Sequence, residues 1–184
     1  MEPRGYAPAQ KWLHWTIALL IVVQAAVGLT MARLGDGELK NTLYELHKSV
    51  GLVVLALALV RILVRARKGA PPLEPGIPGW QRLAAHLSHY ALYVLIVVVP
   101  LAGWTATSSC CAPVNLFWTI PLTLPAPGSE AFAKAVFLVH FALAFTLVGV
   151  ALVHAAAALH HHFVRRDATL LRMLPRRSSA RSGA

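Results

Sequence analysis

The stretch from residue 135 to residue 164 reads AVFLVHFALAFTLVGVALVHAAAALHHHFV and contains no Asp, Glu, Lys or Arg in 30 positions. A helix needs about 20 predominantly apolar residues to cross the hydrocarbon of a bilayer, where charged side chains are costly. The stretch therefore predicts a transmembrane helix, which is tilted or extends beyond the bilayer at one end.

The rest of the chain has the same apolar character. Of its 184 residues, 57% are hydrophobic and 13% are charged, and the mean hydropathy is +0.61, which excludes an ordinary soluble domain. We predict an all-α, integral membrane four-helix bundle in a single domain, residues 1–184. Its four spans are expected at about residues 12–33, 44–64, 83–107 and 135–163. The excess of 17 Lys and Arg over seven Asp and Glu does not indicate a nucleic-acid partner, because no polar fold presents it.

The distribution of basic residues predicts the topology. With four spans, the N-terminus, the 65–82 loop and the basic tail at 165–184 share one side with 13 of the 17 Lys and Arg. By the positive-inside rule both termini are cytoplasmic. The uncharged 108–129 stretch contains Pro113, Pro121, Pro125 and Pro127, so we expect a loop there and not a fifth span. We expect the tail to lie on the membrane surface and then to become disordered.

The two cysteines, Cys110 and Cys111, are adjacent. Adjacent cysteines can close only a strained ring, so the sequence predicts no disulfide framework.

Histidines within the spans are the candidate functional residues, because an imidazole in a membrane helix needs a partner. His140 and His154 are 14 residues apart, which places them within about 40° on one helix face and about 21 Å apart along the axis. One metal ion cannot bind both, so one lies near each membrane surface.

The expected depth of His140 and His154 in the membrane then predicts their partner histidines on other helices. His14 opens the first span at the level of His154, and His47 enters the second at the level of His140. Two imidazoles from different helices are the natural axial ligands of a b-type haem in a helix bundle. The sequence thus predicts two haem b groups, with iron bound by His14 and His154 on the inner side and by His47 and His140 on the outer side. Gly51, one turn from His47, leaves room for a macrocycle.

Two other interpretations of these histidines remain open. A membrane histidine also serves as a hydrogen-bonding group between packed helices. A zinc or copper transporter would use histidines too, although it would usually add carboxylate or thiolate ligands within its spans.

Other side chains near the inner ends of the spans are candidate contacts. Arg61, Arg65 and His89 are candidate partners of haem propionates, although both arginines could equally anchor lipid phosphates. His161 lies on the face of His154, roughly 10 Å further toward the cytoplasm, and could serve a quinone. The adjacent histidines at 160–162 could instead snorkel to the interface.

Five segments resemble the bacterial cytochrome b561 family, including its superoxide oxidase type: KWLHW at 11–15, LHKSVG at 46–51, VRILVR at 60–65, LAAHLSHY at 83–90 and HAAAALHHHFVRRDATLLRMLPR at 154–176. The resemblance implies a superoxide:ubiquinone oxidoreductase in the bacterial inner membrane. Electrons would pass from superoxide at the periplasmic face, through two haems held by the same histidine pairs, to ubiquinone. The alternative is a non-catalytic cytochrome that passes electrons between a redox partner protein, such as a dehydrogenase, and the quinone pool.

Basic residues on the outer side could attract the superoxide anion. They are Arg33, Lys40, Lys48 and Lys134. An equal number of acidic residues on that side, Asp36, Glu38, Glu45 and Glu130, would offset this attraction.

Overall fold

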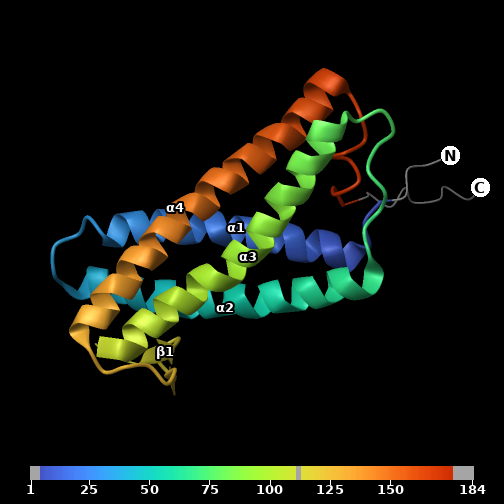
Figure 1. Cartoon of the computed structure of the whole chain (residues 1–184). Helices are drawn as coiled ribbons and strands as arrows, with labels where there is room; N and C mark the ends of the chain where they lie inside the picture. Colours follow the sequence, from blue (N-terminus) through green and yellow to red (C-terminus); the bar gives the residue numbers. More distant parts are fainter. Residues whose placement is uncertain (1–4, 111–112, 176–184) are drawn as a thin grey trace, which may run out of the picture.

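The computed structural model describes residues 5–110 and 113–175 and contains four long helices (Figure 1). They are α1 (Pro8–Met31), α2 (Glu38–Lys68), α3 (Gly79–Cys110) and α4 (Glu130–His160). Each is long and apolar enough to cross a membrane, which confirms the predicted four-helix membrane fold. All four helices begin several residues before the expected spans, because helical hydrogen bonding continues beyond the hydrocarbon into polar surroundings.

Local sequence signals fix the ends of several helices. Pro8 occupies the first turn of α1, where its missing N–H costs nothing, and the side chain of Gln10 accepts a hydrogen bond from the N–H of Ala7 at 3.1 Å. Gly69 ends α2 with a left-handed φ of 69°. Ser129 caps α4 by accepting a hydrogen bond from the N–H of Phe132 at 3.4 Å.

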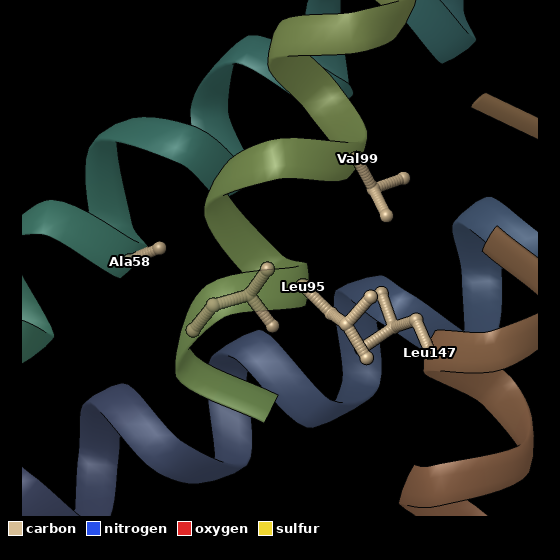
Figure 2. Close-up of a cluster of buried hydrophobic side chains, with 5 residues drawn as sticks. Ala58, Leu95, Val99 and Leu147 are labelled. Atoms are coloured by element: carbon tan, nitrogen blue, oxygen red, sulfur yellow. The ribbon is translucent and has the colours of Figure 1, made fainter. Parts of the chain in front are cut away.

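The helices pack as two pairs that cross each other. Helix α1 packs on α2 and α3 packs on α4, with further contact between α2 and α3 and a small contact between α1 and α4 (Figure 1). A buried apolar cluster lies where the pairs cross (Figure 2). It consists of Ala58, Leu95, Ile96, Val99 and Leu147. This cluster lies in the middle of the bundle and separates its two ends.

One end of the bundle carries a short β-hairpin, and we call it the hairpin end. Strand β1 (Val114–Leu116) pairs antiparallel with β2 (Ile120–Leu122). The fully buried Ser49 of α2 attaches the hairpin, because its Oγ accepts a hydrogen bond from the N–H of Phe117 at 2.8 Å. No helix occurs between residues 113 and 129, as the prolines predicted, but three-residue strands are too short for the sequence pattern to reveal.

The opposite end, which we call the terminal end, brings the two ends of the described chain together. Helix α4 continues as a π-helical turn, His161–Arg165, and residues 166–175 fold back over the bundle. In this return segment the carbonyl of Leu174 accepts a hydrogen bond from Lys11 Nζ at 2.8 Å, and that of Met173 accepts one from Trp15 Nε1 at 2.9 Å. The tail therefore does not leave the bundle at residue 165, because α1 supplies donors for its backbone. Residues 176–184 lie outside the described residues.

The cysteines differ from expectation. Cys110, the last residue of α3, is disulfide-bonded, although the adjacent cysteines had given no reason to expect a disulfide. Cys111 lies outside the described residues.

Candidate functional site

The hairpin end holds one of the two expected histidine pairs. His47 projects from α2 and His140 from α4, with their ring centroids 6.2 Å apart and their planes at 86°. Sequence reasoning had matched these two residues by depth alone, and the structure brings them together.

Glycines on the other two helices make room for this pair. A Cβ added to Gly103 on α3 would lie 3.0 Å from both Cε1 and Nδ1 of His140. One added to Gly28 on α1 would lie 3.3 Å from Cε1 of His47. Each imidazole therefore lies directly against backbone, at a distance that no other residue type would permit without a shift.

Hydrogen bonds orient the same residues. His140 donates its Nδ1–H to the carbonyl of Val99 at 2.9 Å, the kind of contact that fixes the tautomer of a metal-bound histidine and leaves Nε2 for the metal. The amide of Gln24 on α1 donates to the carbonyl of His47 at 2.7 Å. Gly51 faces this Gln24 amide, with an added Cβ 3.4 Å from its nitrogen.

The terminal end holds the second pair. His14 on α1 and His154 on α4 have ring centroids 6.2 Å apart, with planes at 76°. A third imidazole, that of His89 on α3, lies 5.2 Å from His154. The structure thus places His89 beside the pair, at the level where a contact with a bound cofactor was expected.

The separation of the rings fits one iron in each pair. A metal ion lies about 2 Å from an imidazole nitrogen that binds it, so two rings on opposite sides of one iron have centroids roughly 6.3 Å apart. Both measured separations, 6.2 Å, agree with this value. The donors are imidazole nitrogens, and Gly28 and Gly103 let backbone lie directly against the rings of one pair. The residues present therefore fit haem.

Two arginines of α2 extend from the terminal-end pair to the surface. Arg61 Nη1 donates to the carbonyl of Gln10 at 2.9 Å, and its guanidinium lies 5.9 Å from the ring centroid of Tyr93. Arg65 lies over the ring of Tyr6 and lines a cavity of about 650 Å³ with His89. Arg65 and His89 thus face one cavity, whereas Arg61 is not among the residues that line it.

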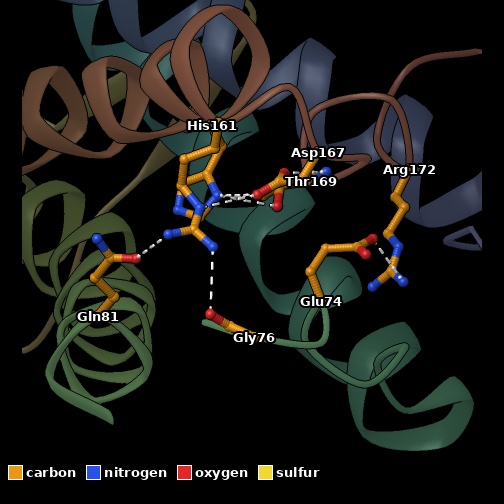
Figure 3. Close-up of polar contacts among 8 residues, drawn as sticks. Glu74, Gly76, Gln81, His161, Asp167, Thr169 and Arg172 are labelled. Carbon is orange, nitrogen blue, oxygen red and sulfur yellow. Dashed lines mark hydrogen bonds and ion pairs between the residues drawn. The ribbon is translucent and has the colours of Figure 1, made fainter. Parts of the chain in front are cut away.

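His161 lies in a polar cluster on the π-helical turn (Figure 3). Its Nδ1–H donates to Asp167 Oδ2 at 2.6 Å, and the N–H of Thr169 donates to Oδ1 of the same carboxylate at 3.0 Å. Partial burial by itself would raise the pKa of Asp167, but the hydrogen bonds from Thr169 and His161 outweigh it and lower the pKa to about 2. Sequence reasoning missed Asp167, although it is the sole acidic residue after Glu130.

The basic residues of the hairpin end are mostly paired with acids. Lys40 binds Asp36 at 2.9 Å, Lys134 approaches Glu130 at 3.6 Å, and Lys48, whose side chain is only 12% exposed, forms an ion pair with Glu45. Among the described residues, Arg33 has no acidic partner. Of the four residues considered for attraction of superoxide, Arg33 is therefore the one with an uncompensated charge.

Comparisons with known proteins agree with this geometry. The family model described as prokaryotic cytochrome b561 matches residues 5–176. The chain is 34% identical over 182 residues to "Cytochrome b561 homolog 2" of Escherichia coli (strain K12), covering 96% of this chain and 95% of that protein. It is 36% identical over 178 residues to "Cytochrome b562" of Cereibacter sphaeroides, covering 94% and 96%. "Probable superoxide oxidase CybB" of Yersinia pestis is 28% identical over 174 residues, covering 95% and 98%.

Proposed function

Because the chain belongs to the prokaryotic cytochrome b561 family, whose members carry haem b and transfer electrons in membranes, we propose that it is a superoxide:ubiquinone oxidoreductase. Two superoxide anions each lose one electron and become O₂ at the hairpin end. One ubiquinone takes up two electrons and two protons at the terminal end and becomes ubiquinol. The observation that carries this proposal is the presence of two imidazole pairs, each 6.2 Å apart, at opposite ends of one bundle.

The two histidine pairs would hold the cofactors. His14 and His154 would bind one haem b at the terminal end, and His47 and His140 the other at the hairpin end. When bound, each haem would supply a one-electron iron couple, and ligation by two histidines would leave no open iron position for oxygen. The residues of the chain supply position and electrostatics.

At the hairpin end the task of the chain is to attract a small anion. Arg33, which lacks an acidic partner among the described residues, follows the last turn of α1. Lys40, Lys48 and Lys134 contribute less to the potential, because a carboxylate lies against each of them. Electrostatic attraction of this kind raises the rate of encounter and weakens with salt.

At the terminal end the task is to bind a quinone and to deliver protons. The Asp167 carboxylate accepts the Nδ1–H of His161 and thereby fixes the orientation of the ring. The hydrogen bonds of His161 within the described residues pass through Nδ1, so Nε2 is the atom that can hold a proton for a quinone oxygen. The cavity beside His89 lies at the same end of the bundle.

The charge distribution supports the orientation in the membrane. Among the described residues, nine Lys and Arg lie toward the terminal end and four toward the hairpin end, so by the positive-inside rule the proposed orientation has both termini in the cytoplasm of a bacterium and the hairpin end in the periplasm. Superoxide would then react on the periplasmic side of the inner membrane, and the quinone would take its protons from the cytoplasmic side.

Two measurements on detergent-purified protein test this function. The spectrum of the dithionite-reduced protein minus that of the oxidised protein, with haem quantified per chain, is expected to show two low-spin b haems. Enzymatically generated superoxide is expected to drive ubiquinone reduction without any other protein, and added superoxide dismutase should abolish it. A colourless protein from haem-replete cells would refute the proposal, as would haem-loaded protein that leaves ubiquinone oxidised.

An electron carrier that serves a partner protein is the second candidate, and the hairpin favours it. Phe117, Trp118 and Ile120 are 44%, 54% and 53% exposed, and such an apolar patch can receive a docking protein. Two of the relatives above bear names that state no reaction. This candidate predicts that a redox partner co-purifies with the protein and reduces it faster than superoxide does.

A further inference from the structure

Each helix of the bundle contributes one residue to each end at the same spacing of 14. The pairs are His14 and Gly28 on α1, His47 and Arg61 on α2, His89 and Gly103 on α3, and His140 and His154 on α4. A spacing of 14 keeps two residues on nearly one face and about 21 Å apart. At the height of the hairpin-end pair, the four helices therefore present two histidines and two glycines. At the height of the terminal-end pair, they present three histidines and Arg61.

Contacts from two neighbouring helices hold Arg61 at that level. It donates to the carbonyl of Gln10, one helical turn before His14, and it lies over Tyr93, one helical turn after His89. Its guanidinium therefore lies at the level of His14, His89 and His154. Among the described residues no carboxylate forms an ion pair with it.

The hairpin-end pair has no comparable charge. Its nearest cation in sequence, Lys48, forms an ion pair with Glu45. Arg33, which also lacks an acidic partner among the described residues, lies five residues beyond Gly28 and so beyond the level of the hairpin-end pair. A positive charge at the level of the histidines thus distinguishes the terminal end from the hairpin end.

From this asymmetry we infer that Arg61 raises the reduction potential of the haem at the terminal end above that of the haem at the hairpin end, and so directs electrons toward the terminal end. The inference rests on the proposed dihaem function. Oxidation of a haem iron adds one positive charge, and a nearby cation disfavours that charge. The effect is strong away from water, where the effective dielectric constant is low. It holds whether the guanidinium acts on the iron directly or neutralises a propionate.

A redox titration followed by absorbance tests this role on purified protein with its haems bound. In Arg61→Gln, which keeps a donor for the carbonyl of Gln10, the higher of the two potentials should fall by at least 59 mV, a tenfold change in the equilibrium between the haems. Arg61→Lys keeps the positive charge, so its higher potential should stay close to that of the unsubstituted protein. Arg67→Gln is the matched control, because it removes one positive charge from an exposed position of the same helix and should shift neither potential.

The outcomes separate this inference from the proposed function. Fewer than two haems in the unsubstituted protein would refute the dihaem function itself. Two haems with unchanged potentials in Arg61→Gln, or an equal fall of both potentials, would refute the role of Arg61 alone. Arg61→Met provides a second neutral variant. If neither neutral variant keeps two haems, Arg61 serves haem retention and the inference is wrong.

Discussion

The two ends of the bundle present the same pair of ligands in different surroundings. At the hairpin end, backbone and glycines enclose the rings of His47 and His140, and a carbonyl hydrogen bond fixes His140. At the terminal end, the pair lies beside His89, the charge of Arg61 and a cavity. The comparison teaches that two equal histidine pairs can have unequal neighbours, and under the proposed function those neighbours would set what each pair does. The hairpin end would hold its haem by close packing, and the terminal end would tune its haem and exchange protons.

Removal of one ligand should separate the two ends most clearly. Each pair spans two helices, so His140→Ala removes one of the two nitrogen donors at the hairpin end and leaves the terminal-end pair intact. We expect one haem per chain in place of two, and His154→Ala should remove the other one. Haem quantification with the reduced spectrum measures both. Loss of both haems or of neither in His140→Ala would refute the pairing.

Replacement of His161 tests the proton-handling role of the terminal end. General acid catalysis contributes about 10²–10⁴-fold to a rate. His161→Ala should therefore slow ubiquinone reduction at least 100-fold, while the haem spectrum and the oxidation of superoxide by the first turnover stay unchanged. Stopped-flow absorbance with and without quinone distinguishes the two steps. His160→Ala, at an exposed position one residue earlier, is the control, and an equal loss in both variants would argue against His161.

A methyl group at Gly103 should disturb the hairpin end alone. The added Cβ would lie 3.0 Å from two ring atoms of His140, so the ring must move and its bond to Val99 must weaken. Loss of such an orienting contact typically costs 10–100-fold in metal affinity. We expect Gly103→Ala to release one haem about tenfold faster to a haem acceptor, and Gly28→Ala, at 3.3 Å, to have a smaller effect.

Gly149→Ala is the matched control for both glycines, since an added Cβ there meets nothing within 4 Å. Unchanged haem release in Gly103→Ala would show that the close contact between Gly103 and the ring of His140 is not needed to hold the haem.

The smallest expected effect is an acid sensitivity of the terminal end. The pKa of Asp167 is about 2 in the folded chain, against an ordinary value of 3.8, so its carboxylate stabilises the fold fully above pH 4. As the pH falls from about 4 to about 2, the unfolded chain binds more protons than the folded one, and the free energy of unfolding decreases. Thermal unfolding in detergent between pH 5 and pH 2 measures the slope, which Asp167→Asn should flatten. An unaltered slope in that variant would assign the acid sensitivity to other groups.

The sequence predicted the four helices and the matching depths of the histidines, because both follow from spacing along a single helix. Charge-free stretches mark the spans, and a spacing of 14 between His140 and His154 fixes their face and their separation. Their role as haem ligands stays a prediction. The same spacing could also have pointed to Gly28, Arg61 and Gly103, each 14 residues from a histidine. Arg61 was predicted as a propionate partner on other grounds, whereas a glycine in a membrane helix does not by itself indicate which ring it will face.

The contacts between helices could not be predicted in this way. That Gly51 faces Gln24 while Gly103 faces His140 depends on the rotation of each helix about its axis, which packing against neighbours determines. The attachment of the hairpin through Ser49 and the return of residues 166–175 to α1 likewise join segments far apart in sequence.

By itself, the sequence determined what lies in the membrane, how deep each histidine lies and how the positive charge is distributed, because hydropathy and helical rise act locally along the chain. Only the tertiary structure decided which residues enclose each pair, that Lys48 is neutralised while Arg61 is not, and that Asp167 orients His161. These outcomes depend on distances between residues of separate helices. Electrostatic and steric effects follow those distances, which cannot be read from neighbouring residues in the sequence.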